Sequence, residues 1–280
     1  RRSDPGYIHH AHVRDLTSLL QPRDLLVVNQ SHVLPARFKG TRTDTGGRAE
    51  GLFIREFAAP QHGPLIWQVL LKLRRTKPGA AVRLSDPSGA PTPIHLRLVE
   101  RVSSGGDPSE GADDTGGWLV SVEGAGESET TRSVLERVGL TALPPYILAA
   151  RKRSEHADDE RTDRERYQTV YASAAPDEDH GRGSVAAPTA GLHFTPELLA
   201  SLRSGGIDRV SVTLHVGTGT FKPVETEFVE QHPIHAEWCT VPRPSAEAIG
   251  RARDTRPAGR IIAVGTTAAR TLESFESIGD

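Results

Sequence analysis

The stretch Asp24-Leu25-Leu26-Val27-Val28-Asn29 decides the fold class. Its four consecutive apolar residues show no polar alternation, which is typical of a strand buried on both faces of a sheet. Such a strand needs helices on both sides. A helical pattern of Val13, Leu16, Leu19 and Leu20 comes before it and ends at Pro22. The segment therefore predicts an α/β domain.

Residues 43–142 have a different pattern. Short alternating or β-branched runs recur at residues 49–57, 65–73, 80–84, 94–99 and 118–122, separated by clusters of Gly, Pro and Asp. Short strands at close spacing predict a small antiparallel barrel. Two segments rich in Gly, Ser and acidic residues, 103–115 and 123–131, are expected to be loops of that barrel.

Helical and strand patterns alternate again after Pro144-Pro145. The clearest helix has Thr195 as N-cap, Pro196 at its first position and Gly205-Gly206 at its end. Strands are predicted at residues 210–214 and 260–264, and a helix follows the second strand. We therefore expect an α/β (α+β) chain of two domains. A mixed-sheet α/β domain is built from residues 1–42 and 143–280, and a small antiparallel β-barrel of residues 43–142 is inserted in it.

The composition excludes several classes of protein. The 34 basic and 36 acidic side chains leave a net charge of −2, so a polyanion must bind a local patch, for which Arg151-Lys152-Arg153 is the densest positive run. That run lies in a charged segment whose default interpretation is a solvated face. The single cysteine, Cys239, excludes a disulfide-stapled scaffold. No apolar run approaches the roughly 18 residues of a membrane helix, and no signal peptide is evident, so we expect a cytoplasmic protein.

Polar groups follow the predicted strands, where open α/β sheets form their sites. After the first strand, Arg37 could clamp a carboxylate or phosphate, or be an ordinary surface arginine. Residues 183–194 crowd small side chains against a helix start, which suits close backbone approach by an anion or a tight structural turn. His215 ends another strand beside Gly217-Thr218-Gly219, which lacks the third glycine of a dinucleotide fingerprint.

A further polar cluster contains Glu225, His232, His235 and Glu237. Two histidines and a carboxylate so close together raise the possibility of a metal site. Pro233 disfavours the helix on which paired ligands usually lie, and no second cluster completes the set. Acid–base or substrate contacts are therefore the favoured interpretation, and structural hydrogen bonding is the alternative.

Several longer strings, taken together and in order, point to one family. They are Leu26-Val27-Val28-Asn29 with Leu34-Pro35-Ala36-Arg37, Leu143-Pro144-Pro145-Tyr146-Ile147, Arg166-Tyr167-Gln168-Thr169-Val170-Tyr171-Ala172, Ala186-Ala187-Pro188-Thr189-Ala190-Gly191-Leu192-His193-Phe194-Thr195, Leu214-His215-Val216-Gly217-Thr218-Gly219-Thr220-Phe221 and Ala263-Val264-Gly265-Thr266-Thr267. The chain thus resembles the S-adenosylmethionine:tRNA ribosyltransferase-isomerase family of queuosine biosynthesis over nearly its whole length. Leu73 stands where the family has a proline. A first strand segment before Arg1 and a closing segment after Asp280 are not in this sequence. It contains no Met, so we expect a longer gene product.

The resemblance implies that S-adenosylmethionine donates its ribosyl group to the aminomethyl of a 7-deazaguanine in tRNA. The products are epoxyqueuosine-tRNA, adenine and methionine. S-adenosylmethionine is a co-substrate here, and no metal or redox cofactor is required. The implied partners are tRNA and S-adenosylmethionine, with no membrane, and we expect a monomer.

The residues proposed for this chemistry fall into two groups. The candidate bases are His215 and then His235, while Glu225 and Glu237 could orient a histidine or stabilise the sulfonium. The substrate-binding candidates are Asn29, Ser31, Arg37, Tyr167, Pro188, Thr189, Gly191, His193, Gly217, Thr218, Gly219, Phe221, Gly265, Thr266 and Thr267.

Three alternatives remain open. The chain could be a non-catalytic RNA-binding protein whose barrel grips tRNA, although the acidic net charge and the few aromatic residues weaken this interpretation. It could be a metal hydrolase that uses His232, His235 and Glu237. A relative of the family could also act on a free deazapurine.

Overall fold

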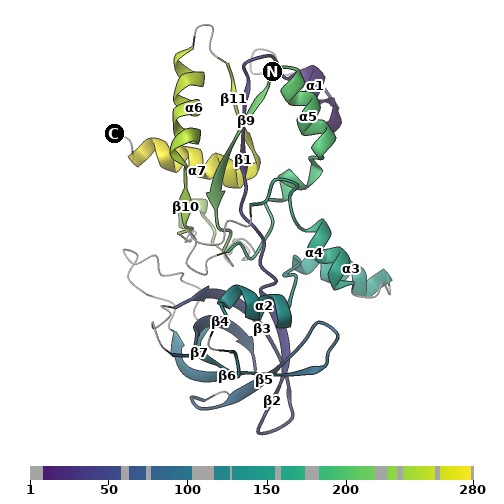
Figure 1. Ribbon diagram of the computed structural model, residues 1–280, viewed down its shortest axis with the longest axis vertical. Coiled ribbons are helices and arrows are strands. Elements are labelled where there is room, and N and C mark those ends of the chain that lie inside the picture. Colours follow the sequence, from purple (N-terminus) through teal and green to yellow (C-terminus); the bar gives the residue numbers. More distant parts are fainter. Residues whose placement is uncertain are drawn as a thin grey trace.

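The computed structural model describes residues 9–57, 63–73, 77–102, 117–126, 128–154, 159–173, 183–217, 226–231, 236–255 and 259–278. It contains a sheet flanked by helices and a separate barrel, and the chain passes from the sheet into the barrel at the end of its first strand (Figure 1). This confirms the predicted α/β chain with an inserted barrel. Within the described residues, every helix is too short or too polar to cross a membrane.

The sheet of the first body has the strand order β10-β9-β1-β11. Strand β1 (Leu25–Asn29) pairs in parallel with β9 (Asp208–Leu214) on one side and with β11 (Ile261–Val264) on the other. The short strand β10 (Cys239–Thr240) runs antiparallel to β9, which makes the sheet mixed. All five residues of β1 are buried, as the apolar run predicted.

Helices cover both faces of this sheet because alternate side chains of β1 point to opposite faces. Leu26 and Val28 pack beside α5 (Pro196–Ser204), η1 (Val13–Asp15) and α1 (Leu16–Leu19). Leu25 and Val27 pack beside α6 (Arg243–Asp254) and α7 (Gly265–Ile278). Helix α5 begins as predicted, since the Thr195 hydroxyl accepts a hydrogen bond from the Leu198 N–H at 3.2 Å.

The barrel has six antiparallel strands in a closed ring, and a short seventh strand is added at β2. They are β2 (Arg37–Arg42), β3 (Arg48–Glu56), β4 (Ile66–Lys72), β5 (Ala81–Ser85), β6 (Pro91–Val102), β7 (Gly117–Glu123) and β8 (Gly139–Leu140). Pairing of β2 with β3 closes the ring. Helix α2 (Thr131–Val138) adds Val134, Leu135 and Val138 to the barrel core. The five predicted runs correspond to β3 through β7.

The barrel begins earlier than the sequence suggested. Residues 37–42 were assigned to the α/β part, but they form β2, which is hydrogen-bonded to β3, β5 and β8. Phe38 and Gly40 of this strand are buried, Arg37, Lys39 and Arg42 are half-buried, and Thr41 is exposed. This alternation over six residues is a weak signal because Gly40 and Thr41 interrupt its apolar side.

Two helices, α3 (Pro145–Ser154) and α4 (Glu160–Arg166), lie beside the point where sheet and barrel meet (Figure 1). Arg151 forms a two-point ion pair with the buried carboxylate of Asp163, with a distance of 2.6 Å from Nη1 to Oδ2. Lys152 and Arg153 are exposed. The expected basic patch therefore lacks Arg151, whose charge is already matched.

Candidate active site

The carboxyl ends of β1, β9 and β11 meet at one edge of the sheet because the three strands are parallel. This edge is turned toward the barrel (Figure 1). Open α/β sheets bind ligands at such an edge, where the loops diverge. The polar segments singled out in the sequence follow these strand ends.

Asn29 ties two of the strand ends together. Its Nδ2 donates to the Leu214 carbonyl at 3.0 Å, and its Oδ1 accepts the N–H groups of Leu214 and Ser31, each at 3.1 Å. The side chain is fully buried. Its polar groups are thus engaged with the backbone, so Asn29 shapes the edge and offers little to a substrate. Ser31 is also buried, and its hydroxyl has no hydrogen-bond partner among the described residues.

The segment of small residues runs along the same edge. Ser184 Oγ donates to the Ala186 carbonyl at 2.6 Å and accepts the Val216 N–H at 3.0 Å. The Val185 N–H donates to the Val216 carbonyl at 3.0 Å, and Ser184 forms a bridge with Val33. The structure therefore brings together the segments that follow β1 and β9 and the segment before α5.

The 3-10 turn η3 (Thr189–His193) continues this segment, with Pro188 buried before it and Thr189 and His193 exposed. A Cβ at Gly191 would lie 2.2 Å from the Tyr171 hydroxyl, so only glycine fits there.

The start of α7 lies beside η3. Gly265 has a φ of +86°, which favours glycine, and a Cβ built on it would be 3.1 Å from the Ala190 Cβ. The next residue, Thr266, is exposed, while Thr267 is half-buried. The two glycine-containing segments thus face each other closely.

His215 is held rigidly directly after β9. Its ring stacks on Trp238, with 5.0 Å between ring centroids and 17° between planes. Its backbone N–H donates to the Trp238 carbonyl at 3.0 Å. The residue is 8% exposed. A buried, stacked imidazole at a strand end suits a positioned acid or base, and it suits a structural contact equally well.

Glu237 uses both oxygens of its carboxylate, and its side chain is 9% exposed. Oε1 accepts the Gly217 N–H at 3.0 Å, and Oε2 accepts Arg270 Nη1 of α7 at 2.5 Å. The carboxylate therefore joins the segment after β9 to α7. This geometry fits a positioning role better than that of a free base.

Comparison with known proteins decides the family. A family model described as "Queuosine biosynthesis protein" matches residues 1–279. The chain belongs to this family. The resemblance found in the sequence strings is thereby confirmed.

Curated relatives carry one common name, S-adenosylmethionine:tRNA ribosyltransferase-isomerase. The protein from Synechococcus elongatus is 41% identical over 279 residues, covering 99% of this chain and 67% of that protein. The one from Gloeobacter violaceus is 43% identical over 266 residues, covering 95% of this chain and 63% of that protein. The chain thus spans about two thirds of their length. A solved S-adenosylmethionine tRNA ribosyltransferase from Thermotoga maritima aligns with 97% of this chain and 61% of its own, at 23% identity and a TM-score of 0.33.

Part of the site predicted for this queuosine biosynthesis protein lies outside the described residues. This applies to Glu225 and His235 of the catalytic set and to Thr218, Gly219 and Phe221 of the substrate-binding set. His232, from the metal hypothesis, also lies there. The described part of the chain holds no group of three His, Cys, Asp or Glu residues that could bind a metal ion.

Two other candidate residues, Arg37 and Tyr167, come from outside the sheet. Arg37 is on barrel strand β2, with Nη2 3.7 Å from a Glu50 oxygen. Tyr167 follows α4 and packs with Val33, Leu143 and Ala187. Burial raises the pKa of its hydroxyl, which keeps that group protonated. Both residues lie near the meeting of barrel and sheet.

Three residues that hold the candidate site residues and the segment after β1 in place were not found from the sequence. Trp238 stacks on His215, Arg270 holds Glu237, and Gln168 holds the segment after β1. Gln168 stands inside a quoted family string and could have been found there. Trp238 and Arg270 could not, because their partners are distant in sequence and known only from the fold.

Proposed function

We propose that the protein transfers and isomerises the ribosyl moiety of S-adenosylmethionine onto 7-aminomethyl-7-deazaguanine in tRNA, giving epoxyqueuosine-tRNA, adenine and methionine. The observation that carries the proposal is the alignment of 95–99% of this chain with relatives of that name. The segments that meet at the sheet edge lie within the aligned length. A tRNA substrate would place the reaction in the cytoplasm, and we propose a monomer as the working form.

The chemistry requires three tasks. A base removes a proton made acidic by the neighbouring sulfonium, a neutral amine attacks, and a hydrogen-bond donor or acid assists the departing adenine. Imidazole suits the first task near neutral pH. His215 is the described histidine at the sheet edge that is buried and fixed by stacking, so we assign it the first role. His235 and Glu225 remain candidates.

The other edge residues would position substrate. Glu237 keeps the Gly217 peptide N–H directed into its own carboxylate, which fixes the course of the loop. Gly191 and Gly265 let η3 pack closely against Tyr171 and against the start of α7, which fixes the shape of the edge that a substrate would meet. Thr189, His193 and Thr266 are exposed beside them and are available for polar contacts.

We propose that no metal or redox cofactor takes part, since the sulfonium already acidifies the proton that must be removed. The prediction is tested by dialysis against a chelator. Activity should persist, and loss that is restored by one particular metal ion would contradict it and favour the hydrolase-like use of His232 and His235.

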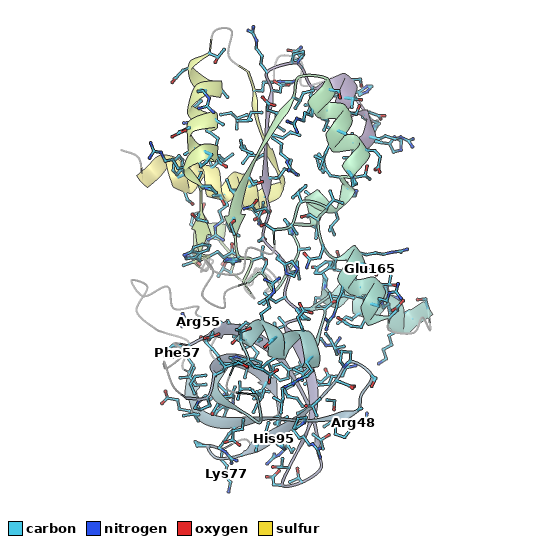
Figure 2. The ribbon with its side chains drawn as sticks, in the orientation of Figure 1. Arg48, Arg55, Phe57, Lys77, His95 and Glu165 are labelled. Carbon is cyan, nitrogen blue, oxygen red and sulfur yellow. The ribbon has the colours of Figure 1, made fainter. Side chains whose placement is uncertain are left out.

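The barrel is the other candidate RNA contact. Phe57 is 45% exposed, and the Arg55 guanidinium lies 5.4 Å from its ring centroid, on the part of the barrel nearest the sheet (Figure 2). Exposed aromatic rings beside arginine stack bases of single-stranded RNA. Phosphate contacts would come from Lys152 and Arg153, and affinity should fall with salt.

The experiment is an adenine-release assay. The protein is mixed with S-adenosylmethionine and either tRNA carrying 7-aminomethyl-7-deazaguanine, the same tRNA with guanine, or the free base. Adenine release with the modified tRNA alone supports the proposal. Release with the free base would assign a free deazapurine as substrate, and tRNA binding with no release in any arm would leave a non-catalytic RNA-binding protein.

A further inference from the structure

A cavity of about 200 Å³ lies between the barrel and the sheet body, on the α4 side. The segment after β1 contributes His32, Val33 and Pro35, α2 of the barrel contributes Glu136, and the end of α4 contributes Tyr167 and Gln168. Pockets for drug-sized ligands measure about 300–1,000 Å³. This cavity therefore suits one flat ring system and is too small for a whole nucleoside.

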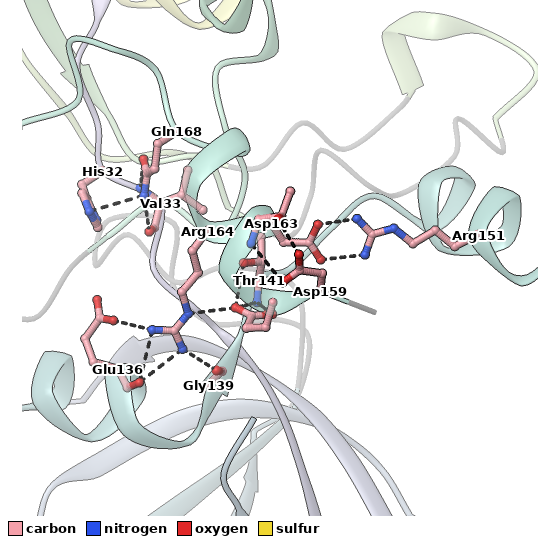
Figure 3. A network of polar contacts seen from close by, with 12 residues as sticks. His32, Val33, Glu136, Gly139, Thr141, Arg151, Asp159, Asp163, Arg164 and Gln168 are labelled. Carbon is pink, nitrogen blue, oxygen red and sulfur yellow. Dashed lines mark hydrogen bonds and ion pairs between the residues drawn. The ribbon is translucent and has the colours of Figure 1, made fainter. Parts of the chain in front are cut away.

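Arg164 supplies no free donor to this cavity, although it lines the wall. Nε donates to Glu160 at 2.9 Å, Nη1 to the Glu136 carboxylate at 2.6 Å, and Nη2 to the Gly139 carbonyl at 2.7 Å (Figure 3). Both terminal nitrogens also reach the Glu136 carbonyl at 3.2 Å. A guanidinium has five N–H groups, so all are used. Arg164 carries one positive charge, and the carboxylates of Glu136 and Glu160 beside it carry two negative charges. This part of the wall therefore repels phosphate and carboxylate ligands and favours ligands that present N–H donors.

Gln168 fixes the tautomer of His32. Its Oε1 accepts the Val33 N–H at 3.1 Å and its Nε2 donates to the Val33 carbonyl at 2.8 Å, so the amide cannot be flipped. The same Nε2 lies 3.3 Å from His32 Nε2, which must therefore be the acceptor (Figure 3). In a neutral imidazole the proton then lies on Nδ1.

The Nδ1–H group of His32 is a buried donor in need of an acceptor. Nδ1 is closed off from solvent and has no hydrogen-bond partner among the residues that the structure describes. Burial lowers the pKa of His32, and the charge of Arg132 lowers it further while Glu136 opposes both. Burial and the charge of Arg132 both favour the neutral ring. An unsatisfied buried donor of this kind is rare in folded proteins, and an acceptor on a bound molecule would satisfy it.

We propose that this cavity binds the guanine-type base of the substrate, 7-aminomethyl-7-deazaguanine. On binding, the His32 ring would turn toward the cavity and exchange its 3.3 Å contact with Gln168 for a hydrogen bond from its Nδ1–H group to the base carbonyl. The adjacent ring N–H and amino group of the base would donate to Glu136. A guanine edge presents one acceptor beside two donors, so it can make one hydrogen bond more to this wall than an adenine edge, which presents one acceptor beside a single donor. The choice of this base among guanine-type rings rests on the proposed function.

The first test observes His32 directly in the wild-type protein. Nitrogen-15 spectra of the histidine rings distinguish a protonated from an unprotonated nitrogen. We expect the Nδ1–H form at pH 7, and the His32 ring signals should shift when the free base 7-aminomethyl-7-deazaguanine is added. Adenine at the same concentration should leave them in place. No shift with the deazapurine, or a shift with adenine instead, would overturn the proposal.

The second test compares affinities for the free base by calorimetry. Glu136→Gln should weaken binding about 10-fold or more, because it removes a charged acceptor. The matched control is Glu165→Gln, on the exposed part of α4 where Glu165 pairs with Arg161, and it should bind as the wild type does (Figure 2). Equal affinity of the two variants would contradict the assignment.

The third test uses two amides at His32. An asparagine amide reaches the place of Nδ1, and a glutamine amide reaches the place of Nε2. His32→Asn should keep affinity within a few fold, while His32→Gln should lose about 10-fold. The reverse order would contradict the tautomer. The assignment of the cavity and the proposed function can fail separately. If the deazapurine shifts the His32 signals but no adenine is released, only the proposed function is refuted. If adenine is released but the His32 signals do not shift, only the assignment of the cavity is refuted.

Discussion

The barrel and the sheet body bury their apolar side chains in different ways. The barrel core is one continuous cluster that also takes in Leu34, Ala36 and Val185 from the segments crossing to the sheet. In the described part of the sheet body, the buried apolar residues divide into four smaller clusters. The sheet body also buries polar side chains such as Asn29 and Ser184, and it holds the half-buried Glu237 by hydrogen bonds.

This difference suggests a division of labour. A closed barrel has no free edges and packs around one interior, so it contributes stability. The sheet body has no continuous apolar core at the carboxyl ends of its strands, because polar groups hold the loops in place there. Stability should therefore depend most on the barrel, and activity most on the edge.

The largest effect on stability is expected from truncation in the barrel core. Phe53, fully buried in edge-to-face contact with Trp67, and Phe194, 5% exposed in the sheet body, are matched for residue type. Phe53→Ala should lower the free energy of unfolding by about 3–5 kcal/mol. Phe194→Ala should cost less, about 2–3 kcal/mol, because its cluster is smaller and can relax more. Urea titration measures both, and a larger loss at Phe194 would break the comparison.

The second-largest effect on stability is expected at the junction between the barrel and the sheet body. Arg164→Met should lower the free energy of unfolding by about 2–3 kcal/mol, because it leaves the Glu136 and Glu160 carboxylates without their shared cation. Arg161→Met is the control, since its ion pair with Glu165 is exposed and should contribute less than about 0.5 kcal/mol. If both variants lose equally little in urea titration, the network does not hold the bodies together.

A third prediction tests the packing of η3. Gly191→Ala places a Cβ 2.2 Å from the Tyr171 hydroxyl and should cost about 1–3 kcal/mol of unfolding free energy. Tyr171→Phe removes that oxygen, which is neutral at pH 7 because burial raises the pKa of Tyr171 to about 12. The loss should therefore be partly recovered in the double variant, as thermal and urea melts of a double-mutant cycle will show. Simple additivity would mean that the two groups do not touch.

The smallest effect is a pH dependence at the start of β1. The Arg260 guanidinium holds the pKa of the buried Asp24 below its ordinary value of 3.8. A carboxyl whose pKa is lowered on folding stabilises the protein above its unfolded pKa, and this contribution is lost as the pH falls through the folded value. Asp24→Asn should cost about 1–2 kcal/mol at pH 7 and less at pH 3, which lies below the ordinary pKa of 3.8. An equal cost at both values in urea titrations would contradict the ion pair.

Much of the fold could be predicted from sequence because the pattern there is local. The run from Leu25 to Val28 and the caps of α5 depend on neighbouring residues only. Strand β2 was misassigned because its membership depends on pairing with β3, β5 and β8, which no local pattern records. For the candidate site, the sequence indicated polar segments after the strand ends, and their role stays a prediction. The hydrogen bonds of Asn29 to the Leu214 backbone and of Glu237 to Arg270 could not be predicted, because they join residues far apart in the sequence.

The most direct test of the central claim, that His215 at the sheet edge acts in the chemistry, is the adenine-release rate of His215→Ala. A positioned acid or base contributes about 10²–10⁴-fold, so the rate should fall by that factor while affinity for S-adenosylmethionine by calorimetry stays the same. His95→Ala, on the barrel at the end away from the sheet, is the control and should keep the wild-type rate (Figure 2). If His215→Ala instead lowers the melting temperature and the folded remainder turns over normally, His215 is structural and the claim is contradicted.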